Sequence, residues 1–341
     1  MNFLQELLRK AVARGASDLH LTVAAPPMMR VKGNLAPVEG YEPLSVAALE
    51  DVIGSLLNDD QHRRYKETGD VDFSIGLPGI GRFRVSAFRQ RGSPAICLRV
   101  IPAQVPPWEQ LGLPPILLEL CDLRHGLVLI TGPTGSGKST TLAAMVDHIN
   151  RRRAAVIITI EDPIEYLHRH HKSIINQREV GSDTVSFAAS LRAALREDPD
   201  VILVGEMRDT ETMATALRAA ETGHLVLSTL HTRGCANTVD RIVDSFPAHQ
   251  QQQVRVQLAD ALQAVIWQQL VPRRDGGVVA ACEIMVATPA IRNLIRDART
   301  FQIPAAMETG ARYGMQTMER ALEELALAGV IDEEVRKEYA H

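Results

Sequence analysis

The chain has 341 residues, of which 45% are apolar and 23% are charged, and its formal net charge is −4. A chain of this length is too long for one ordinary hydrophobic core, so we expect two domains. The composition is typical of a soluble globular protein, and the small negative charge provides no overall attraction to nucleic acid. The sequence contains no apolar run of roughly 18 residues, the length that would indicate a transmembrane helix.

The first twenty residues, up to His20, have the apolar spacing of an amphipathic helix, with Arg9 and Lys10 inside the pattern. A secretory signal would place its positive charges before an unbroken apolar stretch, so we do not expect export. The four cysteines are widely spaced and form no C-x-x-C pair. This spacing excludes a zinc ribbon and argues against a disulfide framework. Reduced thiols in a cytoplasmic protein are the simplest interpretation.

Residues 1–100 mix strand and helix patterns. Alternation of apolar and polar residues predicts strands at 18–23, 28–31, 71–75 and 82–88. Helical patterns lie between them, at 45–57 and 59–67. The sequence therefore predicts a small α+β domain built on an antiparallel sheet.

Five prolines between Ile101 and Pro115 predict a linker over residues 101–115. Beyond it, continuous apolar runs alternate with helical patterns. The runs are 127–130, 156–160, 201–204 and 225–230, and the helical patterns include 139–151, 186–197 and 210–221. Such alternation is typical of a parallel sheet covered by helices on both faces. We therefore predict an α/β domain over residues 116–341 that is mostly helical after residue 250.

The segment from Gly132 to Ser139 matches the pattern G-x-x-x-x-G-K-[ST], between a predicted strand and a predicted helix. Its glycines permit a tight turn in which several backbone N–H groups face one anion, and the helix N-terminus adds partial positive charge. In this pattern Lys138 reaches the β- and γ-phosphates, and the Ser139 hydroxyl holds Mg²⁺. The sequence therefore predicts a site for ATP and Mg²⁺. Its residues are Gly132, Thr134, Gly135, Ser136, Gly137, Lys138, Ser139 and Thr140.

Three carboxylates follow the predicted strand at 156–160, namely Glu161, Asp162 and Glu165. Phosphoryl transfer to water needs a carboxylate that orients and deprotonates the attacking water. A solvated acidic turn around Pro163 explains the same residues equally well.

A second acidic group follows the predicted strand at 201–204. An apolar strand that ends in a carboxylate beside a phosphate loop commonly supplies the second metal-coordinating element of an NTPase. We assign this role to Glu206. Asp209 fits better as the N-cap of the helix predicted at 210–221.

Histidines flank the strand predicted at 225–230, with His224 before it and His231 after it. An imidazole at a strand end can donate a hydrogen bond to a γ-phosphate, although lone histidines are more often structural. A further group, His168, His170 and His171, lacks an acidic partner at helical spacing. We interpret that group as a solvated loop and predict no metal there.

Together these motifs resemble the secretion ATPase superfamily, with the closest likeness to the pilus retraction ATPases, the PilT-like twitching motility proteins. The matching stretches are residues 15–21, 82–85, 159–165, 198–209 and 222–232. In the family's terms, the Walker A loop is 132–140, the aspartate box 159–167, the Walker B element 201–209 and the histidine box 223–232. The resemblance covers nearly the whole chain. It implies an α/β fold with a RecA-like P-loop NTPase core and a small α+β PAS-like N-terminal domain.

The resemblance also implies residue roles. Glu165 is expected to be the general base, and Glu206 is expected to lie at a Mg²⁺-bound water. His231 is expected to sense the γ-phosphate, with His224 in support.

Proteins of this family resemble hexameric rings, which would let Arg82 or Arg84 approach the nucleotide as arginine fingers do. Exposed charges on one strand face explain these two arginines equally well, because the apolar Phe83 between them already satisfies strand alternation.

By resemblance, we expect a homohexameric ATPase motor that drives type IV pilus retraction. It would act on an inner-membrane pilus platform protein, from a peripheral position at the cytoplasmic face. The first alternative is a pilus extension or type II secretion assembly ATPase. Those relatives usually carry a tetracysteine zinc element and a longer N-terminal region, which this sequence lacks.

A nucleic-acid translocase is the alternative of another class. It would be expected to have a basic channel that bears aromatic residues, yet aromatic residues make up only 4% of the chain. We therefore expect no direct nucleic-acid partner. An accessory subunit that binds nucleotide without hydrolysis is disfavoured by the full set of Lys138, Glu165 and Glu206.

Overall fold

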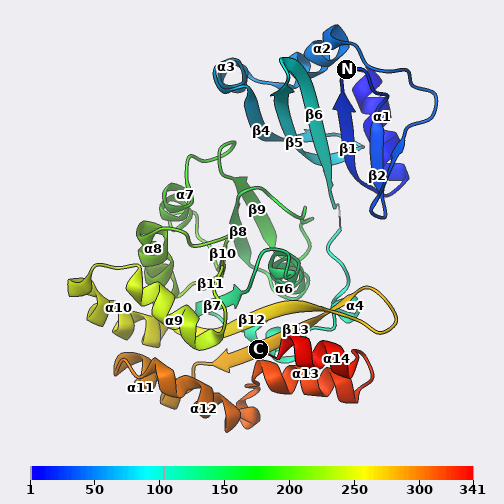
Figure 1. Ribbon diagram of the computed structural model, residues 1–341. Coiled ribbons are helices and arrows are strands. Elements are labelled where there is room, and N and C mark those ends of the chain that lie inside the picture. Colours follow the sequence, from blue (N-terminus) through cyan, green and yellow to red (C-terminus); the bar gives the residue numbers. More distant parts are fainter. Residues whose placement is uncertain (1, 103, 341) are drawn as a thin grey trace. The chain divides into compact units, whose positions relative to one another are not determined.

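The computed structural model describes residues 2–102 and 104–340, and the chain folds into two compact units (Figure 1). The N-terminal unit comprises the chain up to Gln104 together with Glu165–Leu167. The C-terminal unit comprises Val105–Ile164 and the chain from His168 onward. The domain limits expected from the sequence, 1–100, 101–115 and 116–341, stay predictions.

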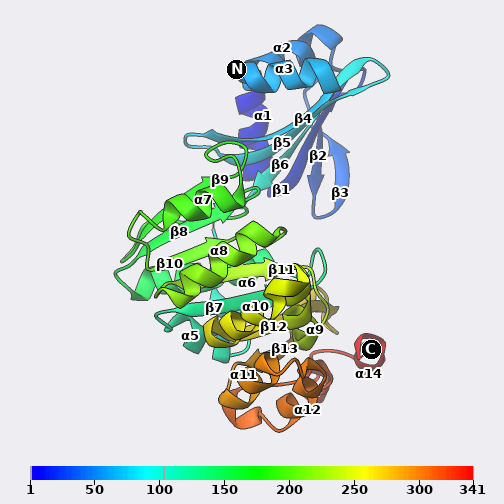
Figure 2. The ribbon, with the colours of Figure 1, turned by 90° about the vertical axis from the view of Figure 1, so that its left-hand side faces the viewer.

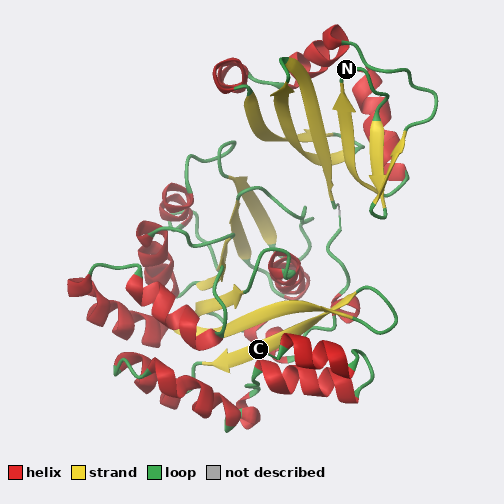
Figure 3. Cartoon of the chain, viewed as in Figure 1, coloured by secondary structure: helices red, strands yellow, loops and turns green. Residues whose placement is uncertain are grey.

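A six-stranded antiparallel sheet forms the N-terminal unit, in the order β3-β2-β1-β6-β5-β4 (Figure 3). Its strands are β1 (Ala16–Thr22), β2 (Met28–Val31), β3 (Asn34–Pro37), β4 (Asp70–Leu77), β5 (Gly81–Gln90) and β6 (Ser93–Ile101). Its helices are α1 (Asn2–Ala13), α2 (Val46–Leu56) and α3 (Asp59–Thr68). Side chains from helices and sheet form one core, in which Leu7, Leu49 and Phe83 are fully buried. The prediction of an α+β arrangement on an antiparallel sheet is confirmed.

The helical pattern extends to His20, but the first helix is shorter. It ends at Ala13, and Gly15 then adopts a φ of 64°, a left-handed conformation that stops a helix. β6 was not predicted, because it lies between β1 and β5 and is largely buried on both faces. A strand buried on both faces shows no alternation of apolar and polar residues.

A seven-stranded sheet forms the centre of the C-terminal unit, in the order β13-β12-β7-β11-β10-β8-β9. Its strands are β7 (Gly126–Thr131), β8 (Val156–Glu161), β9 (Ile174–Glu179), β10 (Val201–Val204), β11 (Leu225–Leu230), β12 (Leu262–Pro272) and β13 (Val278–Val286). The six adjacent strands β12, β7, β11, β10, β8 and β9 are parallel to one another. The edge strand β13 is antiparallel to β12. The predicted parallel sheet is therefore confirmed.

Helices cover both faces of this sheet (Figure 2). One face packs on α5 (Ile116–Cys121) and α6 (Lys138–Arg152). The other packs on α7 (Phe187–Ala194), α8 (Thr210–Glu221), α9 (Cys235–Asp244) and α10 (Ala248–Ala261). The remaining helices are α4 (Trp108–Leu111), α11 (Pro289–Arg296), α12 (Ile303–Glu308), α13 (Met318–Leu327) and α14 (Glu333–Tyr339). Among the described residues, no helix has the length and apolar character needed to span a bilayer.

Most of the regular structure after residue 250 is helical, in α10 to α14, but the prediction of a mostly helical chain there missed β12 and β13. The apolar run Ala264–Trp267 in β12 is fully or almost fully buried. A short apolar run of this kind does not distinguish a buried strand from a buried helix. β12 is the neighbour of β7, the strand that leads into the phosphate-binding pattern.

Candidate nucleotide-binding site

The glycine-rich loop joins β7 to α6 at the carboxyl edge of the parallel sheet. Gly132, Gly135 and Gly137 have φ values of 142°, 81° and 85°, which side chains rarely tolerate. A Cβ at Gly132 would come closer than 3.0 Å to the carbonyl oxygen of Gln268 on β12. A Cβ at Gly135 would meet nothing within 4 Å. The loop is therefore packed tightly against β12 on one side and open at its tip.

Lys138 begins α6, and its ammonium group folds back into the loop. Nζ donates hydrogen bonds to the carbonyl oxygens of Gly132, at 2.9 Å, and Pro133, at 2.8 Å. Burial lowers the pKa of Lys138, and the nearby carboxylate of Glu206 acts in the opposite direction. The structure thus brings the predicted lysine and the predicted Walker B carboxylate together.

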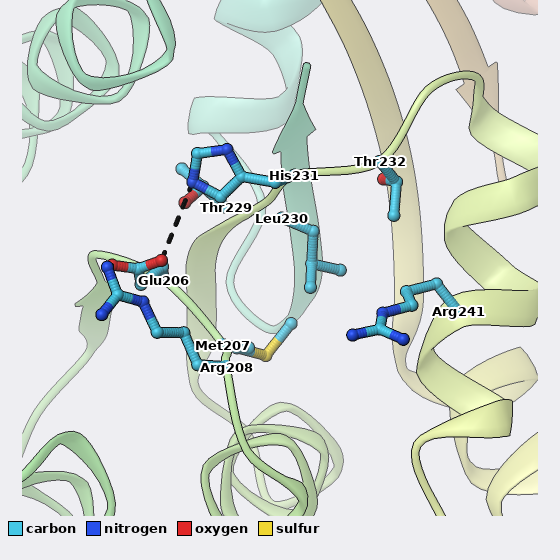
Figure 4. Close-up of a pocket in the computed structure, with 8 residues that line it drawn as sticks. All are labelled: Glu206, Met207, Arg208, Thr229, Leu230, His231, Thr232 and Arg241. Atoms are coloured by element: carbon cyan, nitrogen blue, oxygen red, sulfur yellow. Dashed lines mark ion pairs between the residues drawn. The ribbon is translucent and has the colours of Figure 1, made fainter. Parts of the chain in front are cut away.

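Glu206 follows β10 and is the centre of a small polar group (Figure 4). Its side chain is 13% exposed, with Oε1 2.6 Å from Nη2 of Arg208 and Oε2 3.7 Å from Nε2 of His231. These three side chains line a cavity of about 150 Å³, which Arg241 also lines. His231 reaches it because β11 is parallel to its neighbour β10, so that both strands end at the same edge.

The surroundings of His231 favour the neutral form of its imidazole. Burial lowers its pKa, the charges of Lys138 and Arg208 lower it further, and Glu206 partly offsets them. A neutral imidazole carries one N–H donor and one acceptor. His231 is therefore available as a hydrogen-bond donor beside the phosphate loop.

The structure does not bring His224 to this group within one chain. His224 lies at the amino end of β11, where its Nδ1 is 2.9 Å from the carbonyl oxygen of Ala219 and 3.3 Å from Oγ1 of Thr222. His231 lies seven residues farther along this strand, a distance of about 23 Å at roughly 3.3 Å per residue. The expectation that His224 supports His231 has no geometric support within a single subunit.

Glu165, Arg82 and Arg84 belong to the N-terminal unit. Glu165 and Arg84 are exposed, and Arg82 is partly buried. Phe83 between the arginines is fully buried, as strand alternation predicts. Catalytic roles for these three residues stay predictions.

The rest of the aspartate box is held by local hydrogen bonds. Oε1 of Glu161 accepts from Oγ1 of Thr159, at 2.7 Å, and from Nε2 of Gln177, at 3.1 Å. Glu179 accepts from the backbone N–H of Ile164, at 3.0 Å. These two hydrogen bonds fix the position of the Glu161 carboxylate. Asp209 accepts from the N–H of Thr212 as the N-cap of α8, as predicted.

The three clustered histidines differ from one another. His170 and His171 are exposed, but Nδ1 of His168 is buried and has no hydrogen-bond partner among the described residues. Burial lowers the pKa of His168 to about 4. The interpretation as a solvated loop is therefore wrong for His168. Among the described residues, no three His, Cys, Asp or Glu side chains are placed to hold a metal.

Sequence reasoning missed Gln268, which contacts the loop from β12. Its side chain is 1% exposed. Nε2 donates to the carbonyl oxygen of Ser136, at 2.7 Å, and Oε1 accepts from Oγ1 of Thr141, at 2.8 Å. The available signal was a glutamine directly after the apolar run Ala264–Trp267. Without knowing that this run is a strand next to β7, the sequence does not indicate what the glutamine contacts.

Residues 1–328 match the model of a family described as type II/IV secretion system protein. A Pseudomonas aeruginosa protein named type IV pilus retractation ATPase PilT is 49% identical over 99% of this chain and 98% of its own length. A Neisseria gonorrhoeae protein named twitching motility protein is 49% identical over 98% of this chain and 89% of its own length. A crystal structure of the pilus retraction motor PilT with bound ADP matches with a TM-score of 0.91 at 50% identity, over 98% of this chain and 96% of that one.

The structural likeness confirms the predicted fold class. The C-terminal unit is an α/β RecA-like core that carries the P-loop, and the N-terminal unit is the small α+β PAS-like domain.

We predict that Gly132→Ala disrupts the loop far more than Gly135→Ala. Both residues have positive φ, so each alanine costs about 1–2 kcal/mol of backbone strain. Only at Gly132 would the new Cβ also collide with the backbone of β12. Urea denaturation and ADP titration of both variants test this. A similar loss of stability and affinity in the two variants would contradict the described packing.

We predict that buried His168 makes stability fall as the pH is lowered. In the unfolded chain the imidazole takes up a proton near its ordinary pKa of 6.5, whereas in the folded chain it does so only near 4. The contribution of His168 to the free energy of unfolding is therefore fully present above pH 6.5. The free energy of unfolding should fall by about 2 kcal/mol between pH 7 and pH 5. His168→Leu should remove this part of the decrease, and His171→Gln, at an exposed position, should keep it. An unchanged slope in His168→Leu contradicts the prediction.

Proposed function

The chain belongs to the type II/IV secretion system protein family, and on that premise we propose that it is a hexameric ATPase motor that drives type IV pilus retraction. The observation that carries the proposal is the near-full-length likeness to proteins named for pilus retraction and twitching motility. The predicted resemblance to the pilus retraction ATPases is thereby confirmed. The enzyme is an ATP hydrolase of the secretion type.

The loop fits a nucleotide phosphate chain. Its tip is open at Gly135, and the Lys138 ammonium is already drawn into it by two carbonyl oxygens. Oγ of Ser136 is buried without a hydrogen-bond partner in the described part of the chain, so it offers a further donor. A phosphate oxygen would replace the carbonyl partners of Lys138 and gain a charge-assisted hydrogen bond.

Mg²⁺ fits the donor set beside the loop. Oxygen ligands suit this ion, and it commonly keeps several waters. Ser139 would hold it directly and Glu206 through a water, and the ion would neutralise charge that develops on the β- and γ-phosphates. Because Glu206 is paired with Arg208, this pair must loosen for Glu206 to act there.

Three side chains would have separate roles in ATP hydrolysis. Lys138 binds the β- and γ-phosphates. His231, whose lowered pKa favours the neutral form, donates an N–H to the γ-phosphate and so responds to its presence or loss. Glu165 accepts the proton of the attacking water as general base.

The hexamer and its membrane partner complete the proposal. Arg82 or Arg84 would approach the nucleotide as an arginine finger, a contribution worth about 10³–10⁵ in rate where it occurs. The motor would act at the cytoplasmic face of the inner membrane, where it would transmit its motion to a pilus platform protein. We propose no direct contact with nucleic acid.

A pilus extension or type II secretion assembly ATPase is the second candidate, because the matched family includes type II as well as type IV systems. Both candidates share the nucleotide chemistry. They differ in the direction of pilus movement, so a cellular experiment separates them.

We predict that Glu165→Gln separates hydrolysis from binding. The substitution removes the base but keeps the phosphate loop, so ADP and ATP affinity should change little while turnover falls by about 10²-fold or more. Lys138→Ala is the matched contrast, because it should weaken nucleotide binding itself by about tenfold or more. Nucleotide titration and steady-state phosphate release measure the two effects. Wild-type turnover in Glu165→Gln would exclude Glu165 as the base.

We predict that deletion of this gene in its source organism leaves excess surface pili and abolishes twitching. Retraction removes assembled pili, so its loss should allow them to accumulate. Piliation and surface movement are scored together, with the wild-type gene restored as the control. Cells without pili would support the assembly ATPase instead.

A further inference from the structure

Two of the three loop glycines make room for the same residue of β12. A Cβ at Gly132 would collide with the backbone carbonyl oxygen of Gln268, and a Cβ at Gly137 would lie 2.8 Å from its Nε2. Gly135, which does not face β12, has open space instead. The glycines of the loop therefore serve the approach of Gln268 as well as the turn itself.

The side chain of Gln268 uses both ends of its amide. Nε2 donates to the carbonyl oxygen of Ser136, and Oε1 accepts from Oγ1 of Thr141. All three side chains are at least 97% buried. Loss of one partner would leave a buried polar group without a hydrogen bond, which is unfavourable.

The bond to Ser136 sets the direction of a backbone donor. The carbonyl of Ser136 and the N–H of Gly137 belong to one planar trans peptide group, so they point in opposite directions. Because the carbonyl is held toward β12, the N–H of Gly137 points away from β12. That direction leads to the side of the loop where a phosphate is bound in this pattern.

We propose that Gln268 is a positioning residue of the nucleotide site: it fixes the Ser136–Gly137 peptide so that the N–H of Gly137 faces the bound phosphate. The inference rests on the proposed nucleotide binding and adds the element that orients the loop. Gln268 itself does not touch the nucleotide. It acts through Ser136 and Thr141, and it ties the loop to the strand that follows α10.

An amide meets both requirements at any pH, because it carries an N–H donor and a carbonyl acceptor. Leucine has nearly the same volume but neither donor nor acceptor. An ionised glutamate accepts from Thr141 but cannot donate to the Ser136 carbonyl, whereas a protonated glutamate does both. Gln269, the next residue of β12, is partly exposed and alternates to the other face, so it provides a matched control.

The test compares ADP affinity and ATPase kinetics of the full chain carrying Gln268→Leu, Gln268→Glu or Gln269→Leu. We expect Gln268→Leu to weaken ADP binding and raise the KM for ATP by about tenfold or more, with kcat at saturation changed only a few-fold. Gln269→Leu should remain within twofold of the wild type. Gln268→Glu should bind ADP more weakly, relative to the wild type at the same pH, as the pH rises from 6 to 9. A purely structural role would not produce that pH dependence.

The outcomes distinguish this inference from the proposed function. If the wild type itself does not bind ADP, the proposed function fails. If the wild type binds ADP and Gln268→Leu binds it within twofold with the same KM, the positioning role is overturned. If Gln268→Leu does not fold, Gln268→Glu decides: a constant ratio to the wild type across the pH range overturns the role, and a ratio that worsens with pH supports it.

Discussion

The nucleotide site depends on one constraint: the phosphate loop must lie directly against β12 while its backbone donors stay turned toward the ligand. Glycine at positions 132 and 137 allows this approach, because a side chain there would collide with Gln268. The amide of Gln268 then satisfies the buried carbonyl of Ser136. A loop held on its outer side keeps its shape without a ligand, so less conformational entropy is lost on binding.

The polar side chains around this loop already have partners within the chain. Lys138 is bound to two backbone carbonyl oxygens, Glu206 is paired with Arg208, and the pKa of His231 beside them is lowered by burial and by nearby positive charges. In the proposed motor, a triphosphate replaces these partners instead of recruiting distant groups. A buried charge that loses one partner must gain another, because an unpaired buried charge is unfavourable. The positions of these side chains should therefore depend on whether the triphosphate is bound. In this proposal, the side chains that bind the nucleotide also respond to loss of its γ-phosphate.

The parts of the site that follow strand ends could be predicted from the sequence. Continuous apolar runs indicated parallel strands, and parallel strands place Lys138, Glu206 and His231 at one edge. Gln268 and the burial of His168 could not be predicted in this way. Gln268 matters only because β12 is the neighbour of β7, and that pairing joins segments more than 130 residues apart. Nδ1 of His168 is buried although His170 and His171 close by in the sequence are exposed, so the local sequence does not indicate its burial.

The sequence by itself determined the chemistry of the phosphate loop, because turn geometry, anion-binding N–H groups and a lysine at fixed spacing are local properties. It also determined the parallel sheet, through runs of apolar residues between helical patterns. Only the tertiary structure decided which strand supports the loop and which acids and histidines lie near it. His224 and His231 show why: they stand seven residues apart, yet a strand carries them to opposite edges of the sheet. Distance in space follows strand direction and pairing, which short motifs do not contain.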